Sequence, residues 1–308
     1  MPRFSSLILF LSAASAVTAT AGVTPAPIFG DFMVFQAERP APIFGSATPG
    51  EKVVVTVTKK VGPGLYDDGS VVTTTAADDG RWLAEVGPFS AGEELAIAIT
   101  AGDGRTITFT DVLAGDVWLC SGQSNMEWPL NNTLDGDREA KAATDDSIRL
   151  FTVPKNSVRE PQFGLKGEPG RGEPSAARWV KLSPAAANSF SAVGYHFGKT
   201  VRNAVGRPIG LIDSSWGGTP SEAWTRRAKL EQIQSARPLL ERWEQYDAAY
   251  EAGNRDAGNW AGTYGPLHPH HPSNLNHGMI APLVPVALSG AIWYQGESNA
   301  GRAEQYDD

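Results

Sequence analysis

The stretch GDVWLCSGQSNMEWPL, residues 115–130, determines how this chain is interpreted. Its first half is apolar and predicts a buried strand that ends at Gly122, and Ser124 follows where the chain must turn. Such a hydroxyl lies at the carboxyl end of a strand, which is the edge where open α/β sheets bind ligands. The turn would expose the hydroxyl while nearby backbone N–H groups face a developing oxyanion. Ser124 is therefore a candidate nucleophile, although a Gly-x-Ser triplet alone is most often a plain turn.

Two later segments have the same form. The stretches GLIDSSWGGTP (residues 210–220) and AIWYQGESNAG (residues 291–301) each join an apolar strand to a polar turn that contains glycine. Three strands thus end in small, hydrogen-bonding turns, as a site at the edge of a sheet requires.

At these residues the chain resembles a known family. Residues 115–130, 215–224 (SWGGTPSEAW) and 293–300 (WYQGESNA) are similar to the signature blocks of sialate O-acetylesterase-like proteins, which belong to the SGNH/GDSL hydrolase superfamily. The resemblance extends from about residue 25 to the last residue. It implies an N-terminal β-domain before the hydrolase domain, and a carbohydrate O-acetylesterase that acts on an acetylated sugar without a cofactor.

The composition is typical of a soluble globular protein of about two domains, since 41% of the 308 residues are hydrophobic and 19% are charged. The net charge of -8 argues against a nucleic acid or an anionic membrane as partner. Cys120 is the single cysteine, so no internal disulfide is possible, and its apolar strand predicts a packed core thiol. The oligomeric state is left open.

The first 22 residues are expected to be a secretory signal peptide. Arg3 supplies a positive charge, residues 7–17 are mostly apolar, and Ala19-Thr20-Ala21 resembles a small-x-small cleavage site. The apolar run is short for a membrane span, so we expect a secreted or periplasmic protein without a membrane contact after cleavage. An uncleaved anchor is the alternative.

After the predicted signal peptide, the sequence has two parts that differ in composition. Residues 23–112 predict an all-β sandwich domain, because short runs rich in Val and Thr alternate with Pro-Gly, Asp-Gly or Gly-Asp turns. The clearest runs are residues 51–58, 70–75, 94–100 and 105–110. Residues 113–308 predict a three-layer α/β domain of the SGNH-hydrolase type with a mainly parallel sheet, because strands alternate with helices.

Two helical segments and two loops are expected in this second part. Asn188 or Ser189 is predicted to cap a helix that carries an apolar stripe of Phe190, Val193, Phe197 and Val201. Residues 221–252 are helix-prone, with an inward face formed by Leu230, Leu239, Leu240 and Trp243. Long loops over residues 154–178 and 253–276 are expected at the active edge of the sheet.

Ester hydrolysis by a serine requires a base and donors for the oxyanion. The candidate donors are the backbone N–H of Ser124, that of Gly217 or Gly218, and a side chain of the third block. The superfamily has an Asn in a Gly-x-Asn-Asp pattern there, whereas this chain has Gly-Glu-Ser-Asn over residues 296–299. All three polar neighbours therefore remain candidates for oxyanion or substrate binding: Gln295, Ser298 and Asn299.

The sequence does not identify the general base. The superfamily carries an Asp-x-x-His near the C-terminus, and none of the five histidines lies three residues after an aspartate: His196, His268, His270, His271 and His277. The sequence stops directly after the third block, where family members normally continue. We therefore expect a C-terminally truncated copy of a longer enzyme, with an incomplete α/β domain.

Other polar residues have simpler interpretations. His277 is conceivable near the pocket, but a loop or cap role is preferred, and His196 is predicted to be exposed on its helix. No metal is expected at His268, His270 and His271, because no Cys or carboxylate stands at ligand spacing.

Three functions are weighed. The first is a secreted carbohydrate O-acetylesterase, in particular a sialate O-acetylesterase, with Ser124 as nucleophile. The second is a carbohydrate-binding fragment without turnover, because the Asp-x-x-His is absent. The third is glycoside hydrolysis by Glu127 and Glu297. Carboxylates that accept turn N–H bonds would look the same in sequence, and this turn-stabilising role is preferred for both residues.

Overall fold

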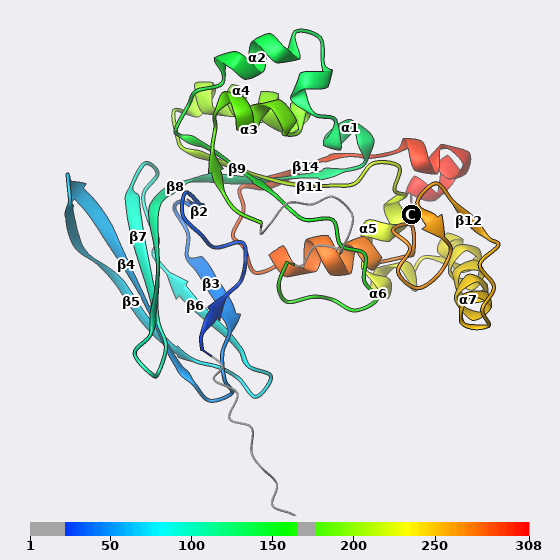
Figure 1. The fold of residues 1–308 in the computed structure, drawn as a ribbon, viewed down its shortest axis with the longest axis horizontal. Helices are drawn as coiled ribbons and strands as arrows, with labels where there is room; N and C mark the ends of the chain where they lie inside the picture. Colours follow the sequence, from blue (N-terminus) through cyan, green and yellow to red (C-terminus); the bar gives the residue numbers. More distant parts are fainter. Residues whose placement is uncertain (1–21, 166–176, 308) are drawn as a thin grey trace, which may run out of the picture.

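The computed structural model describes residues 22–165 and 177–307 (Figure 1). Residues 1–21 of the predicted signal peptide and residues 166–176 of the first predicted loop lie outside the described residues. The described chain has a mixed α/β fold, with a nine-stranded mixed sheet, a three-stranded antiparallel sheet and a two-stranded sheet. The mixed α/β class expected from the sequence is confirmed at this level.

The β-rich part contains the four predicted strand runs. Strands β4 (Lys52–Gly62), β5 (Leu65–Thr75) and β7 (Glu94–Thr100) pair antiparallel, and the fourth run begins β8 (Thr106–Gly122). They face the three-stranded sheet, which is formed by β1 (Thr24–Pro25), β3 (Ala41–Ser46) and β6 (Arg81–Val86) (Figure 1). Alternate side chains of both sheets meet in one buried core because successive strand residues point to opposite faces.

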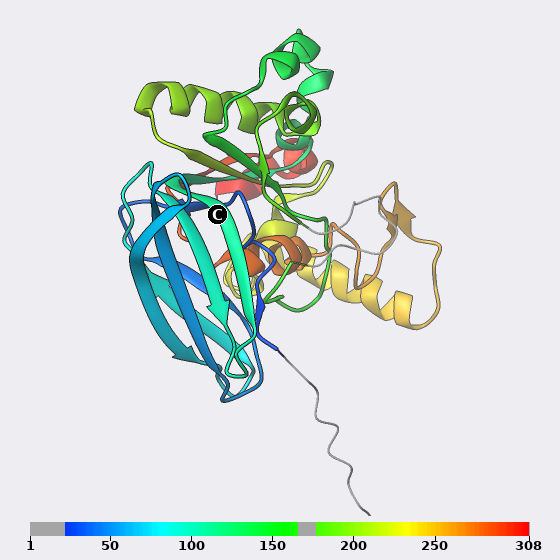
Figure 2. The same cartoon turned by 60° about the vertical axis from the view of Figure 1, so that its left-hand side comes forward.

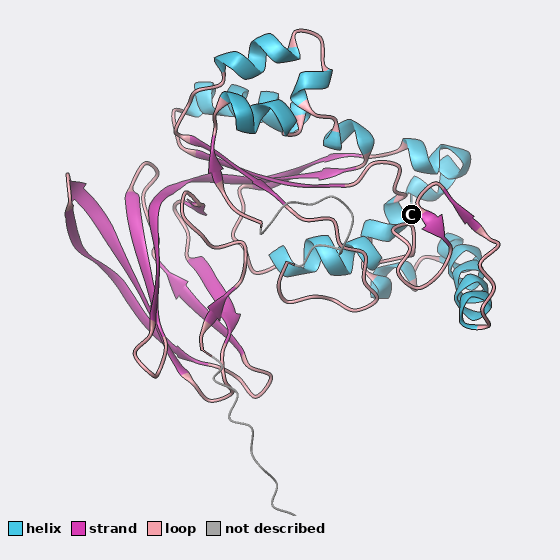
Figure 3. Ribbon diagram, viewed as in Figure 1, coloured by secondary structure: helices cyan, strands magenta, loops and turns pink. Residues whose placement is uncertain are grey.

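Strand β8 runs unbroken across the predicted domain boundary at residues 112 and 113 (Figure 3). Its first half pairs antiparallel with β7, and its second half pairs parallel with β11 (Ile209–Ser215) and β14 (Gly290–Tyr294). Asp111 has a positive φ of 55° where the register with β7 shifts, so the strand bends at this point. The short strand β2 (Val34–Gln36) also pairs with β8.

The second part has the expected mainly parallel strands. Strand β9 (Ile148–Thr152) pairs parallel with β11, and β10 (Val180–Lys181) adds an antiparallel edge. Figures 1 and 2 show α2 (Gly136–Ala142), α3 (Pro184–Ser189) and α4 (Ala192–Val205) on one face of these strands. On the opposite face lie α5 (Ser221–Trp224), α6 (Arg227–Leu230) and the turns of residues 276–283.

The predicted cap of the fourth helix was wrong. Asn188 and Ser189 end α3, and Ser191 is the N-cap of α4, where its hydroxyl accepts the N–H of Gly194 at 3.0 Å. The two helices are separated because the buried Phe190 is extended and its carbonyl accepts the N–H of Leu130. The rest of the predicted stripe packs partly buried against the second core cluster: Val193, Phe197 and Val201.

Residues 221–252 are helical as predicted but are divided into three α-helices and a short 3-10 helix (Gln234–Ala236), and the last α-helix is α7 (Arg237–Glu251). The expected inward residues are all buried: Leu230, Leu239, Leu240 and Trp243. The hairpin of β12 (Gly258–Asn259) and β13 (Gly262–Thr263) interrupts the second predicted loop. In the described part of the chain, every helix is too short or too polar to span a bilayer.

Candidate active site

Ser124 begins the short helix α1 (Ser124–Glu127) directly after β8, at the carboxyl edge of the parallel strands. The turn depends on Gly122, because a methyl group there would lie 2.1 Å from the Tyr294 carbonyl oxygen and its φ is 145°. The Gly122 carbonyl accepts the N–H of Trp216 at 3.1 Å, and the Gln123 N–H donates to Tyr294 at 3.0 Å. The structure thus brings the three predicted turns together at one edge.

Side chains join the first turn to the third. The buried amide of Gln123 donates to Glu297 at 2.9 Å, while its oxygen accepts from Gln295 at 3.1 Å. The same oxygen accepts the backbone N–H of Ser298 at 3.2 Å, and Asn125 donates to Glu297 at 2.7 Å. Glu297 is therefore engaged by two amides.

Glu127 joins the first turn to the second. Its carboxylate accepts the backbone N–H of Gly217 and forms an ion pair with Lys155. Each of the two glutamates thus binds neighbouring turn residues, which is the preferred interpretation of the sequence. A free acid–base pair of the glycosidase type has no support in this arrangement.

Several candidate oxyanion donors are already engaged. The Gly217 N–H is bound to Glu127, the Gln295 amide nitrogen lies within hydrogen-bond distance of three protein oxygens, and the Asn299 amide donates to Glu222 at 2.9 Å. The backbone N–H groups of Ser124 and Gly218 have no acceptor among the described residues. The Ser298 hydroxyl likewise has no partner among the described residues, since only its backbone N–H is bound, so these three donors are open to a ligand.

The described residues place no base at the nucleophile. Ser124 Oγ has no hydrogen-bond partner in the described part of the chain. His277 lies against the backbone of Val158 and Arg159, and burial lowers its pKa, which fits the loop role that was preferred. His196 is exposed on α4, as predicted. Within residues 22–165 and 177–307, no three metal-ligating side chains are grouped.

Asp213 is a feature that the sequence analysis did not single out. It lies near the end of β11 and is buried, with 6% of its surface exposed. The Ser215 hydroxyl donates a hydrogen bond to its carboxylate at 2.6 Å. Burial raises the pKa of Asp213 to about 7, and the nearby charge of Glu127 acts in the same direction. Cys120, on the adjacent strand, is fully buried, and burial raises the pKa of its thiol, as expected of a core residue.

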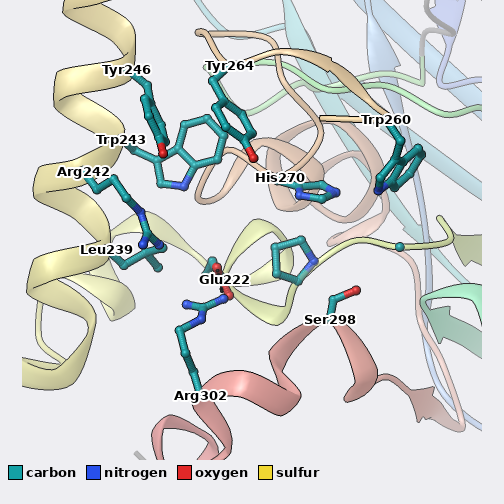
Figure 4. A pocket seen from close by; sticks show the side chains of 12 residues that line it. Glu222, Leu239, Arg242, Trp243, Tyr246, Trp260, Tyr264, His270, Ser298 and Arg302 are labelled. Atoms are coloured by element: carbon teal, nitrogen blue, oxygen red, sulfur yellow. Dashed lines mark hydrogen bonds and ion pairs between the residues drawn. The ribbon is translucent and has the colours of Figure 1, made fainter. Parts of the chain in front are cut away.

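A cleft of about 440 Å³ opens next to this edge. Gly217 adjoins Ser124, since a methyl group at Gly217 would lie 3.4 Å from Ser124 Cβ, and Gly218 and Ser298 line the cleft itself (Figure 4). Gly218 has a φ of 73°, and the exposed ring of Trp260 covers it. The other lining residues come from the segments that follow Gly218 and Ser298, from α7 and from residues 264–270: Pro220, Glu222, Leu239, Arg242, Trp243, Tyr246, Tyr264, His270 and Arg302.

Comparison with known proteins agrees with the three sequence blocks. No protein-family model matches the chain. Rat sialate O-acetylesterase is 31% identical over 314 residues, which cover 97% of this chain and 56% of the rat protein. The human sialate O-acetylesterase is 32% identical over 277 residues, which cover 87% of this chain and 47% of the human protein.

A solved structure supports the fold as well. The crystal structure of a carbohydrate acetylesterase from Xanthomonas citri matches with a TM-score of 0.70 at 32% identity, over 90% of this chain and 52% of that chain. The chain spans about half the length of the curated relatives it matches.

Proposed function

Because the chain is a homologue of the sialate O-acetylesterases over 97% of its length, we propose that it is a carbohydrate O-acetylesterase that acts on an acetylated sialic acid. The observation that carries the proposal is the position of Ser124. Its hydroxyl lies at the carboxyl edge of the parallel strands, next to a cleft lined by aromatic and polar side chains.

The proposed reaction is serine acyl transfer. Ser124 Oγ attacks the acetyl carbonyl, its proton passes to a base, and the N–H groups of Ser124 and Gly218 stabilise the negative oxygen. The sugar hydroxyl leaves with a proton, and water then attacks the acetyl-enzyme to release acetate and restore the serine.

The test replaces the nucleophile. We expect Ser124→Ala to lower kcat/KM for acetate release from O-acetylated N-acetylneuraminic acid by roughly 1,000-fold or more, because the covalent route is lost. Ser90→Ala, at an exposed serine of the β-rich part, is the matched control and should retain the wild-type rate. Equal acetate release by the wild type and Ser124→Ala would refute the proposal.

A second candidate is carbohydrate binding without turnover. It is favoured by one observation, which is that no histidine of the described residues is hydrogen-bonded to Ser124 Oγ. In this case the wild type would bind a sialic acid with the same Kd as Ser124→Ala, and neither protein would release acetate.

A further inference from the structure

The cleft beside Ser124 contains an arginine without an ionic partner. Arg242 lies on α7 and is exposed to the cleft, and no carboxylate of the described residues is within ion-pair distance of it. The residues one helical turn away on α7 are uncharged: Pro238, Leu239, Gln245 and Tyr246. This guanidinium is therefore available to an anion from outside.

The other charges of the cleft are balanced. Arg302 donates to Glu222 at 2.8 Å, so this pair carries no net charge. Burial lowers the pKa of His270, which keeps its ring neutral near pH 7. Arg242 thus gives the described walls of the cleft one net positive charge, in a protein whose formal net charge is -8.

The remaining walls have the character of a sugar site. The rings of Tyr246 and Tyr264 stack against each other with centroids 4.6 Å apart and line the cleft, and Trp260 is 67% exposed, so its indole offers a flat apolar surface. The imidazole of His270 lies against the backbone of Gly218 in the same wall of the cleft.

We propose that this cleft binds an acidic sugar by its carboxylate, and that Arg242 is the residue that recognises the acid. The planar guanidinium matches a carboxylate in a two-bond arrangement, which gives both affinity and a fixed orientation. Figure 4 shows Arg242 and Ser298 on opposite sides of the cleft. The carboxylate then lies at the α7 side and the acetyl ester at the side that adjoins Ser124; only the placement of the ester rests on the proposed function.

The test measures binding, so it does not depend on turnover. The probes are N-acetylneuraminic acid and its methyl ester, which has the same ring without the charge, titrated by calorimetry at low ionic strength. We expect the wild type to bind the acid at least tenfold more tightly than the methyl ester. Arg242→Gln should bind the acid at least tenfold more weakly, with little change for the methyl ester.

Arg237→Gln is the matched control, because this exposed arginine lies on the same helix but outside the cleft. It should bind both sugars as the wild type does. Circular dichroism spectra and unfolding midpoints of all variants establish that the fold is retained. Arg242→Lys keeps the charge without the planar fork, so it should restore part of the preference for the acid.

Each outcome decides the proposal. Equal binding of acid and methyl ester by the wild type, binding of neither sugar, or an unchanged preference in Arg242→Gln would each overturn it. If acetate release fails the Ser124→Ala test while the binding depends on Arg242, the acid site remains and the esterase proposal falls. If acetate release depends on Ser124 but the wild type shows no preference for the acid, the esterase proposal stands and the acid-site proposal falls.

Discussion

Asp213 is the carboxylate whose ionisation the fold changes most clearly. Its ordinary pKa is 3.8, and burial raises the pKa to about 7, with Glu127 adding to the rise. The hydrogen bond from Ser215 and the charge of Lys155 oppose this change. Above pH 7 the protein therefore holds a charged group in a site from which water is excluded.

This raised pKa predicts a dependence of stability on pH. Below pH 3.8 the folded and unfolded states both hold the proton, and between pH 3.8 and 7 only the folded state holds it. The stabilisation by this group is thus lost as the pH rises towards 7, by at most about 1.4 kcal/mol per pH unit. Asp213→Asn removes the ionisation. The free energy of unfolding of the variant, measured with urea and taken relative to that of the wild type, should therefore increase between pH 5 and pH 8.

Asp137→Asn, at an exposed aspartate of α2, is the control for the added amide. Its unfolding free energy should follow that of the wild type at both pH values. A difference between Asp213→Asn and the wild type that is constant with pH would contradict the prediction.

At the same scale, the sequence could place Ser124 but not its donors. Strand residues followed by a glycine and a serine predict a hydroxyl at a turn from local chemistry alone. Whether the Gly217 N–H is open or bound depends on Glu127, which lies 90 residues away in the chain. Such long-range partners leave no local pattern in the sequence.

Among the elements, β8 connects the two parts of the molecule, and Gly122 ends it at the site. The close approach of the Tyr294 carbonyl oxygen, 2.1 Å from where a methyl group would lie, allows only glycine there. We expect Gly122→Ala to separate β14 from β8 and to displace Ser124. The unfolding free energy should fall by roughly 2 kcal/mol or more, with a large loss of any acetate release.

Gly30→Ala is the matched control, since nothing lies within 4 Å of the added methyl group. Urea unfolding of both variants gives the comparison. If the wild type and Gly122→Ala had the same free energy of unfolding, the prediction would be wrong, because the end of β8 would then accommodate the methyl group without loss of stability.

The elements were predicted well where a local signal sets them. The Val- and Thr-rich runs became β4, β5 and β7 because their alternation matches a half-buried strand. The cap of α4 was misplaced because Ser189 and Ser191 look alike in sequence, and only the burial of Phe190 separates the two helices. The continuity of β8 was missed because one strand serves two pairing patterns.

At the scale of the whole molecule, the cleft is assembled from segments that are far apart in sequence. Arg242 comes from α7, Trp260 from the β12–β13 hairpin, and Ser298 from the turn after β14. The polar turns could be predicted because they carry recognisable sequence blocks. The aromatic walls and Arg242 could not, because isolated side chains on a helix and a hairpin have no spacing pattern of their own.

One core also joins the β-rich part to the parallel strands, and this predicts how the protein unfolds. Ile97 of β7, Ile212 of β11 and Met279 belong to the same buried cluster, and β8 passes through both parts. Loss of packing in the first part should therefore destabilise the second. We expect Ile97→Ala to cost about 2–5 kcal/mol and to lower the melting temperature of the helices, all of which, among the described residues, follow β8.

Calorimetry and far-ultraviolet circular dichroism should report the same single transition, shifted equally by Ile97→Ala. Leu134→Ala, at a side chain that is 94% exposed, should leave both signals unchanged. Two calorimetric transitions, or helices that melt at the wild-type temperature in Ile97→Ala, would mean that the β-rich part unfolds by itself. A single shared shift would instead mean that β8 and the common core hold Ser124 in place from both sides, so the geometry of the site depends on the whole chain.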